Sequence, residues 1–113
     1  MLIGAEAVAV WLVVEPCDMR KWIDGLAQAV VDSLHRRPIS GEVFAFRNQA
    51  RDKVKLLWWD KNGFWVAYKR LEAGKFRWAT AGGRIELSEL MLLLEGVDLC
   101  VPRLRRVEVQ QVN

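Results

Sequence analysis

The sequence predicts an α+β fold in a single domain spanning residues 1–113: an antiparallel sheet of about five strands, one long helix packed across a face, and a short C-terminal helix. Two observations predict this fold. A helical period runs through the first third of the chain, and a period of two, broken by turn residues, replaces it from Glu42. The length and the 52% hydrophobic content suffice for one modest core, and are too little for two.

The first expected element is a buried strand over Val8–Val14, a run rich in β-branched residues that Glu15-Pro16 ends. The apolar stretch from Met1 has no basic leader, contains Glu6, and stops before the roughly 20 residues that span a bilayer. We therefore expect no signal peptide, no transmembrane helix, no contact with a membrane and a cytoplasmic location.

A long helix is expected from Met19 to Leu34, with Asp18 as its N-cap. Its apolar side chains fall within about half of the helix circumference, so that face should pack against the sheet. Arg36-Arg37-Pro38 should end the helix, because cations favour its C-terminal dipole and proline cannot continue it. The apolar positions recur at spacings of three and four: Met19, Trp22, Ile23, Leu26, Ala27, Val30, Val31 and Leu34.

Three strands are then expected over Val43–Phe46, Lys53–Trp59 and Phe64–Leu71, because each run is rich in β-branched or aromatic residues. Asp60–Gly63 predicts a hairpin between the last two, since asparagine and glycine tolerate positive φ. The sequence leaves two registers open. The connection is either a two-residue Asn62-Gly63 turn or a three-residue loop with a glycine bulge.

A further short strand is expected over Phe76–Trp78, because glycine-containing turns bracket it. Ser88 should cap a short helix over Glu89–Glu95, which Gly96 ends. From about residue 103 the polar tail is expected to be loosely ordered.

No metal and no cofactor is expected. Cys17 and Cys100 are the only cysteines and His35 is the only histidine, whereas a structural zinc site needs four ligands. Carboxylates such as Asp18, Asp24, Asp60, Glu72 and Asp98 are present, but no nucleophile, base or phosphate-cradling glycine loop accompanies them. We expect no catalytic residues, and therefore a protein that is not an enzyme.

Several short blocks stand in a recognisable order along nearly the whole chain. They read DMRK at 18–21, FRN at 46–48, KLLWWD at 55–60, YKRLE at 68–72 and LEGVD at 94–98. In this combination the chain resembles the second-open-reading-frame, or TnpB-type, proteins of the insertion-sequence 66 transposons. It departs from that pattern at Trp22, where a small residue is usual. The resemblance implies an accessory role in transposition, beside a separate and larger transposase that carries the strand-transfer chemistry.

Charge is concentrated in the middle of the chain, where residues 36–77 carry 11 basic and 4 acidic side chains. Such an excess favours an anionic partner, and transposon DNA fits the resemblance. A plainer interpretation is that strands need one polar face, which lysine and arginine commonly supply. The candidate contacts are Arg20, Lys21, Arg47, Arg51, Lys53, Lys55, Lys69, Arg70, Lys75 and Arg77, interleaved with Trp58, Trp59, Trp65 and Tyr68.

Two features keep a second function open, in which the chain binds the element's transposase or a second copy of itself without contacting DNA. Trp58 and Trp59 must point to opposite faces of a strand, so only one can enter the core covered by the helix. Arg20 and Lys21 would oppose the dipole of the expected helix, so they need an ion pair with Asp24, a phosphate or an acidic partner.

Overall fold

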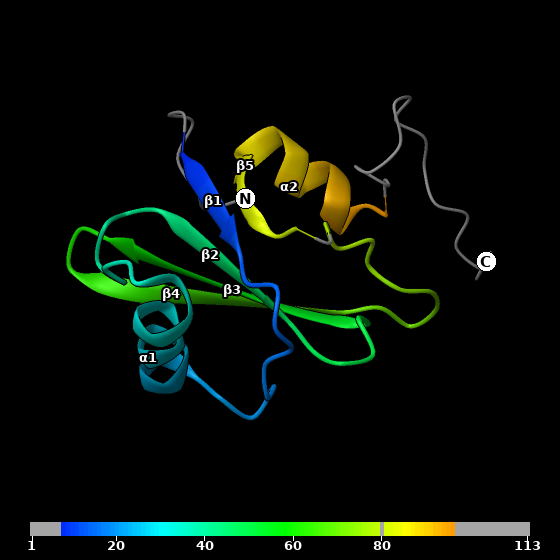
Figure 1. The fold of residues 1–113 in the computed structure, drawn as a ribbon, viewed down its shortest axis with the longest axis horizontal. Helices are drawn as coiled ribbons and strands as arrows, with labels where there is room; N and C mark the ends of the chain where they lie inside the picture. Colours follow the sequence, from blue (N-terminus) through cyan, green and yellow to red (C-terminus); the bar gives the residue numbers. More distant parts are fainter. Residues whose placement is uncertain (1–7, 80, 97–113) are drawn as a thin grey trace.

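The computed structural model describes residues 8–79 and 81–96. Helices α1 (Ile23–Leu34) and α2 (Leu87–Leu94) lie on opposite faces of one five-stranded sheet (Figure 1). The strands, given along the chain, are β1 (Ala9–Leu12), β2 (Val43–Arg47), β3 (Lys53–Asp60), β4 (Gly63–Arg70) and β5 (Gly83–Glu86). The α+β class is confirmed, and none of the described helices is long and apolar enough to cross a membrane. The expected loose tail and Asp98 and Cys100 lie outside the described residues.

The sheet is mixed, so the expectation of an antiparallel sheet was wrong. Its order is β4-β3-β2-β1-β5, and β1 and β2 run parallel with Val10 opposite Val43 and Leu12 opposite Ala45. Parallel neighbours need a crossover, and α1 supplies it by carrying the chain back from the end of β1 to the start of β2. The other three pairings are antiparallel.

The expected long helix is also wrong at its start, because α1 begins at Ile23 and has only 12 residues. Asp18 caps a turn instead: its Oδ1 accepts a hydrogen bond from the Arg20 amide at 2.9 Å. The carbonyl oxygens of Met19 and Lys21 accept from the Lys55 ammonium, at 2.6 and 2.8 Å. Residues 18–22 therefore form a separate turn that β3 holds.

Phe76–Trp78 is not a strand, although both aromatic side chains are buried. The Phe76 amide donates to the Arg51 carbonyl, so this segment is attached to the β2–β3 loop and crosses the sheet without pairing in its ladder. The fifth strand is β5, and α2 follows it directly. Glu86, not Ser88, caps α2 through a reciprocal capping box with Glu89.

Each face of the sheet carries its own hydrophobic cluster, because neighbouring strand residues point to opposite sides. The cluster on the α1 face contains Val13, Leu26, Val30, Phe44, Phe46 and Leu57. The cluster on the α2 face contains Val10, Leu12, Val43, Ala45, Val54, Leu56, Trp58, Phe76, Trp78, Ile85, Leu90 and Leu93. Segment 76–78 thus covers the α2 face of the sheet with Phe76 and Trp78.

The β3–β4 hairpin follows neither register that the sequence left open. Asp60 pairs with Gly63, so Lys61 and Asn62 form a two-residue connection. Lys61 adopts the left-handed conformation, with φ of 55°. This register puts Trp58 opposite Trp65 on the α2 face and Trp59 opposite Phe64 on the α1 face.

Candidate nucleic-acid interface

Basic side chains gather at one end of the sheet, where β2 ends, β3 begins and β4 ends. Lys53 pairs with Arg70 in the ladder. Just beyond it, the Leu71 amide donates to the Asp52 carbonyl at 2.8 Å, and the Phe76 amide donates to the Arg51 carbonyl at 2.7 Å. These bonds bring residues 70–77 beside residues 47–53. We name this region the basic end; it carries Arg47, Arg51, Lys53, Arg70, Lys75 and Arg77 against two acids, Asp52 and Glu72.

Asn48 fixes the β2–β3 loop of the basic end. Its Oδ1 accepts from the amides of Asp52 and Lys53 at 3.1 and 3.0 Å, and its Nδ2 donates to Asp52 Oδ1 at 2.7 Å. The Asn48 bond, together with Lys53, lowers the pKa of Asp52 below its usual value. Arg51 sits in this loop at φ of 61°, a conformation that a non-glycine residue rarely adopts. The side chain of Arg51 is therefore presented from a loop whose backbone is held in place.

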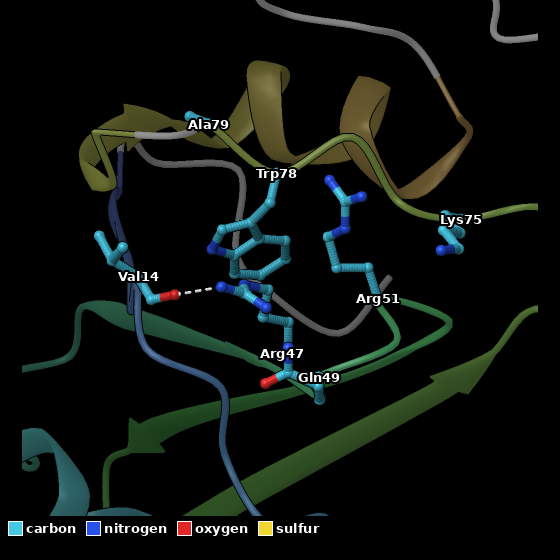
Figure 2. A pocket seen from close by; sticks show the side chains of 7 residues that line it. All are labelled: Val14, Arg47, Gln49, Arg51, Lys75, Trp78 and Ala79. Atoms are coloured by element: carbon cyan, nitrogen blue, oxygen red, sulfur yellow. Dashed lines mark hydrogen bonds between the residues drawn. The ribbon is translucent and has the colours of Figure 1, made fainter.

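A pocket of about 470 Å³ opens at the basic end (Figure 2). Three of the side chains that line it, Arg47, Arg51 and Lys75, are cationic, and none of the described lining residues is acidic. They come from the end of β2, the β2–β3 loop and the irregular segment before Trp78. We name it the cation pocket; its lining is Val14, Arg47, Gln49, Arg51, Lys75, Trp78 and Ala79.

Two backbone carbonyls hold the Arg47 guanidinium in the cation pocket. Its Nη2 donates to the Val14 carbonyl at 2.6 Å and its Nη1 to the Asn48 carbonyl at 3.3 Å, while its Nε is buried and has no partner among the described residues. Both acceptors are neutral. The positive charge of Arg47 is thus held in position, and no carboxylate of residues 8–79 or 81–96 pairs with it.

Lys53 and Arg70 lie outside the pocket and are ion-paired. Lys53 Nζ lies 3.4 Å from an Asp52 oxygen, and Arg70 Nε lies 2.9 Å from a Glu72 oxygen. The hydrogen bond to Glu72 raises the pKa of the Arg70 guanidinium. Exposed pairs of this kind add little stability, so they can exchange their partner for a phosphate at small cost.

Two of the candidate contacts, Lys55 and Lys69, bind backbone carbonyls and stabilise the fold. They are therefore no longer candidates for binding DNA. Lys55 is only 3% exposed, and its ammonium binds the two carbonyls of the 18–22 turn. The same ammonium lies 4.5 Å from the Trp22 ring centroid and 5.2 Å from that of Tyr68. Lys69 donates to the Leu94 carbonyl at 2.8 Å, at the C-terminus of α2 where a cation is favourable.

Arg20 and Lys21 precede α1, so the expected conflict with the helix dipole does not arise. Arg20 pairs with Asp18 at 2.7 Å and not with Asp24. Its hydrogen bonds lower the pKa of Asp18 to about 2. The Cys17 amide donates to the Arg47 carbonyl, which places this segment beside the end of β2. Both basic residues are exposed and border the basic end.

The aromatic candidates divide by exposure. Trp58 is buried at 6% and stacks on Trp65, with ring centroids 6.2 Å apart. Trp59 is half-buried and meets Phe64 edge to face at 5.0 Å. Trp65 and Tyr68 are 43% and 49% exposed. Trp22 was expected on the buried stripe of the helix, but it is 53% exposed.

Sequence reasoning missed four of the residues that line the cation pocket: Val14, Gln49, Trp78 and Ala79. Gln49 is an ordinary polar loop residue, and nothing in its neighbourhood marks it. Trp78 gives a weak signal, because a tryptophan that directly follows Arg77 in a glycine-bounded segment must find cover somewhere.

The role of Asn48 can be tested. Replacing Asn48 with alanine removes three hydrogen bonds, and we expect it to lower the free energy of unfolding by about 2 kcal/mol. Amide hydrogen exchange should speed up at residues 49–53 more than in β1. Replacing Gln49, which is exposed in the same loop, is the control and should change stability by less than about 0.5 kcal/mol. Unchanged exchange in the loop would show that Asn48 does not hold it.

Comparisons with known proteins agree over most of the chain. A family model described as IS66 Orf2 like protein matches residues 8–103. The uncharacterized protein y4hO of Sinorhizobium fredii is 37% identical over 101 residues, covering 87% of this chain and 88% of its own. The uncharacterized protein y4jC of the same organism is 30% identical over 101 residues, covering 87% and 86%. No solved structure matches.

Proposed function

The chain belongs to the IS66 Orf2-like family of insertion-sequence accessory proteins, and from this premise we propose that it binds the DNA of its element through the basic end. The cation pocket is the observation that carries the proposal. Arg47, Arg51 and Lys75 line it, and none of its described lining residues is acidic. Asn48 holds the loop that carries Arg51, and the Val14 and Asn48 carbonyls hold Arg47. Lysine and arginine contacts to phosphates supply most of the affinity of DNA-binding proteins and set their position on the duplex.

The surface around the pocket extends the same chemistry. Lys53 and Arg70 lie on the α1 side of the basic end, and Arg20 and Lys21 lie beside the end of β2. A phosphate backbone that passes over this end of the sheet therefore meets further cations beside the pocket, on the α1 side of the sheet. In this proposal the protein acts in the cytoplasm and breaks no bond itself, and strand transfer belongs to the separate transposase.

Charge reversal tests the proposal. Each of the changes Arg51→Glu and Lys75→Glu should weaken binding to the element's terminal DNA by about 10-fold near 0.1 M salt, as expected for one lost phosphate contact. Fluorescence anisotropy at two salt concentrations measures this, with a scrambled duplex for comparison. In a plot of the logarithm of the binding constant against the logarithm of the salt concentration, each change should reduce the magnitude of the slope by about one.

The matched control is Lys61→Glu. Lys61 lies in the β3–β4 turn, at the opposite end of β3 from Lys53, so it loses the same charge away from the basic end. Its affinity should stay within about twofold of the unaltered protein if contacts at the basic end dominate. Absence of binding to any duplex at low salt would overturn the proposal.

The exposed aromatic rings favour a second candidate, a surface that binds the element's transposase or a second copy of the chain. Trp65 and Tyr68 are both on β4, whose outer edge pairs with no described strand. Aromatic side chains are enriched at protein interfaces. Loss of transposase co-purification on Trp65→Ala, with DNA affinity unchanged, would favour this function over DNA binding.

A further inference from the structure

The cation pocket has the features of a discrete site and differs from a merely basic surface. Arg47 is its fixed charge: the guanidinium is held by the Val14 and Asn48 carbonyls, and its buried Nε has no partner in the described part of the chain. A partly desolvated cation that no carboxylate accompanies is unfavourable until an anion approaches it. Within the described part of the chain, the pocket therefore carries positive charge that no anionic group balances.

The two other cations are available to a ligand. Neither the Arg51 nor the Lys75 side chain makes a hydrogen bond or an ion pair with any described residue. Both line the pocket that Arg47 lines, and the Phe76–Arg51 backbone bond ties their two segments together. Figure 2 shows the Arg51 guanidinium between the Trp78 ring and Lys75. Lys53 and Arg70 differ, because Asp52 and Glu72 already pair with them.

We propose that the cation pocket binds one phosphate group, with Arg51 and Lys75 as its ligands and Arg47 as a fixed positive charge beside them. An arginine can donate two parallel hydrogen bonds to phosphate oxygens, and a lysine acts as a point charge. The volume of about 470 Å³ leaves room for the phosphate and for the atoms attached to it. The assignment rests on the proposed function in one respect: DNA is the source of the phosphate, either as an internal phosphodiester or as a phosphomonoester at a strand end.

The pocket can be tested with inorganic phosphate alone. In a titration of the full chain followed by NMR, the indole N–H of Trp78 and the amide of Arg51 should shift saturably. Arg51→Gln and Lys75→Gln should each raise the dissociation constant by about 10-fold, because each removes a charge-assisted contact. Lys61→Gln is the matched control and should leave the constant unchanged. A linear response, or one that Arg51→Gln leaves intact, would overturn the site.

A second arm identifies the source of the phosphate. Arg51→Gln is compared with the unaltered protein on oligonucleotides that carry a 5′-phosphate or a 5′-hydroxyl. A preference for the 5′-phosphate that Arg51→Gln abolishes assigns the terminal phosphomonoester, and equal weakening on both assigns the internal phosphodiester. If Arg51→Gln weakens neither, the site does not serve DNA. Binding of inorganic phosphate without any DNA binding would support the phosphate site and overturn the proposed function. DNA binding without a response to phosphate would support the proposed function and overturn the phosphate site.

Discussion

Replacing Lys55 with methionine is expected to lower the free energy of unfolding by about 3 kcal/mol. Methionine replaces most of the aliphatic part of the side chain but cannot donate to the Met19 and Lys21 carbonyls, which the ammonium binds at 2.6 and 2.8 Å. A buried acceptor left unsatisfied costs about 1–3 kcal/mol, and two partly buried acceptors are left here. The variant also loses the cation–π contacts of Lys55 with Trp22 and Tyr68. Urea denaturation followed by circular dichroism gives the value.

The control is Lys53→Met, two residues away on the same face of β3. The Lys53 side chain is partly exposed and, among the described residues, pairs only with Asp52, so its loss should cost less than about 1 kcal/mol. Equal effects of the two changes would mean that the Lys55 ammonium does not hold the 18–22 turn. The comparison matters for function as well, because Lys55 lies in the basic stretch of the sequence. A loss of DNA binding on its replacement would reflect unfolding and not a lost contact.

Local patterns predicted most elements of the fold. The helical period marked α1, although four residues too early, and the period of two marked β2, β3 and β4 close to their observed bounds. Those signals are local, because one buried face imposes each period. The start of α1 could not be read in this way: Met19 and Lys21 give their carbonyls to Lys55, more than 30 residues away along the chain.

Strand order is a second property that local patterns do not contain. A sequence of strand, helix and strand is compatible with several arrangements, and only the crossover through α1 makes β1 and β2 parallel. Phe76–Trp78 was expected to be a strand because glycine-containing turns bracket it. Its backbone is held by the Arg51 carbonyl and its side chains cover the α2 face, so tertiary contacts override the local signal.

The sequence predicted which stretch of the chain contains the candidate site, but not which of its basic side chains come together. The charge of residues 36–77 identified all three cations of the pocket, but it also included Lys55 and Lys69, which bind backbone carbonyls. Charge counts cannot separate the two groups, because a lysine that satisfies a carbonyl and one that meets solvent have the same sequence signature. Only the positions of the acceptors, set by the folded chain, distinguish them.

Trp78→Ala is expected to have the largest effect, lowering the free energy of unfolding by about 4 kcal/mol. Trp78 is 5% exposed in the cluster on the α2 face, and its Nε1 donates to the Val13 carbonyl at 2.9 Å. The indole therefore attaches the irregular segment to the end of β1 while it lines the cation pocket. Trp78→Phe keeps most of the packing and should cost only about 1–2 kcal/mol, the cost of the unsatisfied carbonyl.

Trp65→Ala is the matched control, since it removes the same side chain from an exposed position on β4 and should cost less than about 1.5 kcal/mol. Denaturation by urea, followed by circular dichroism, avoids the change in fluorescence that any tryptophan replacement brings. If Trp78→Ala costs no more than Trp65→Ala, the segment 76–78 is not part of the core. If Trp78→Ala costs the expected amount, the Trp78 side chain belongs both to the core and to the wall of the pocket. Phosphate affinity should then be measured in Trp78→Phe, which keeps the wall in place, rather than in Trp78→Ala.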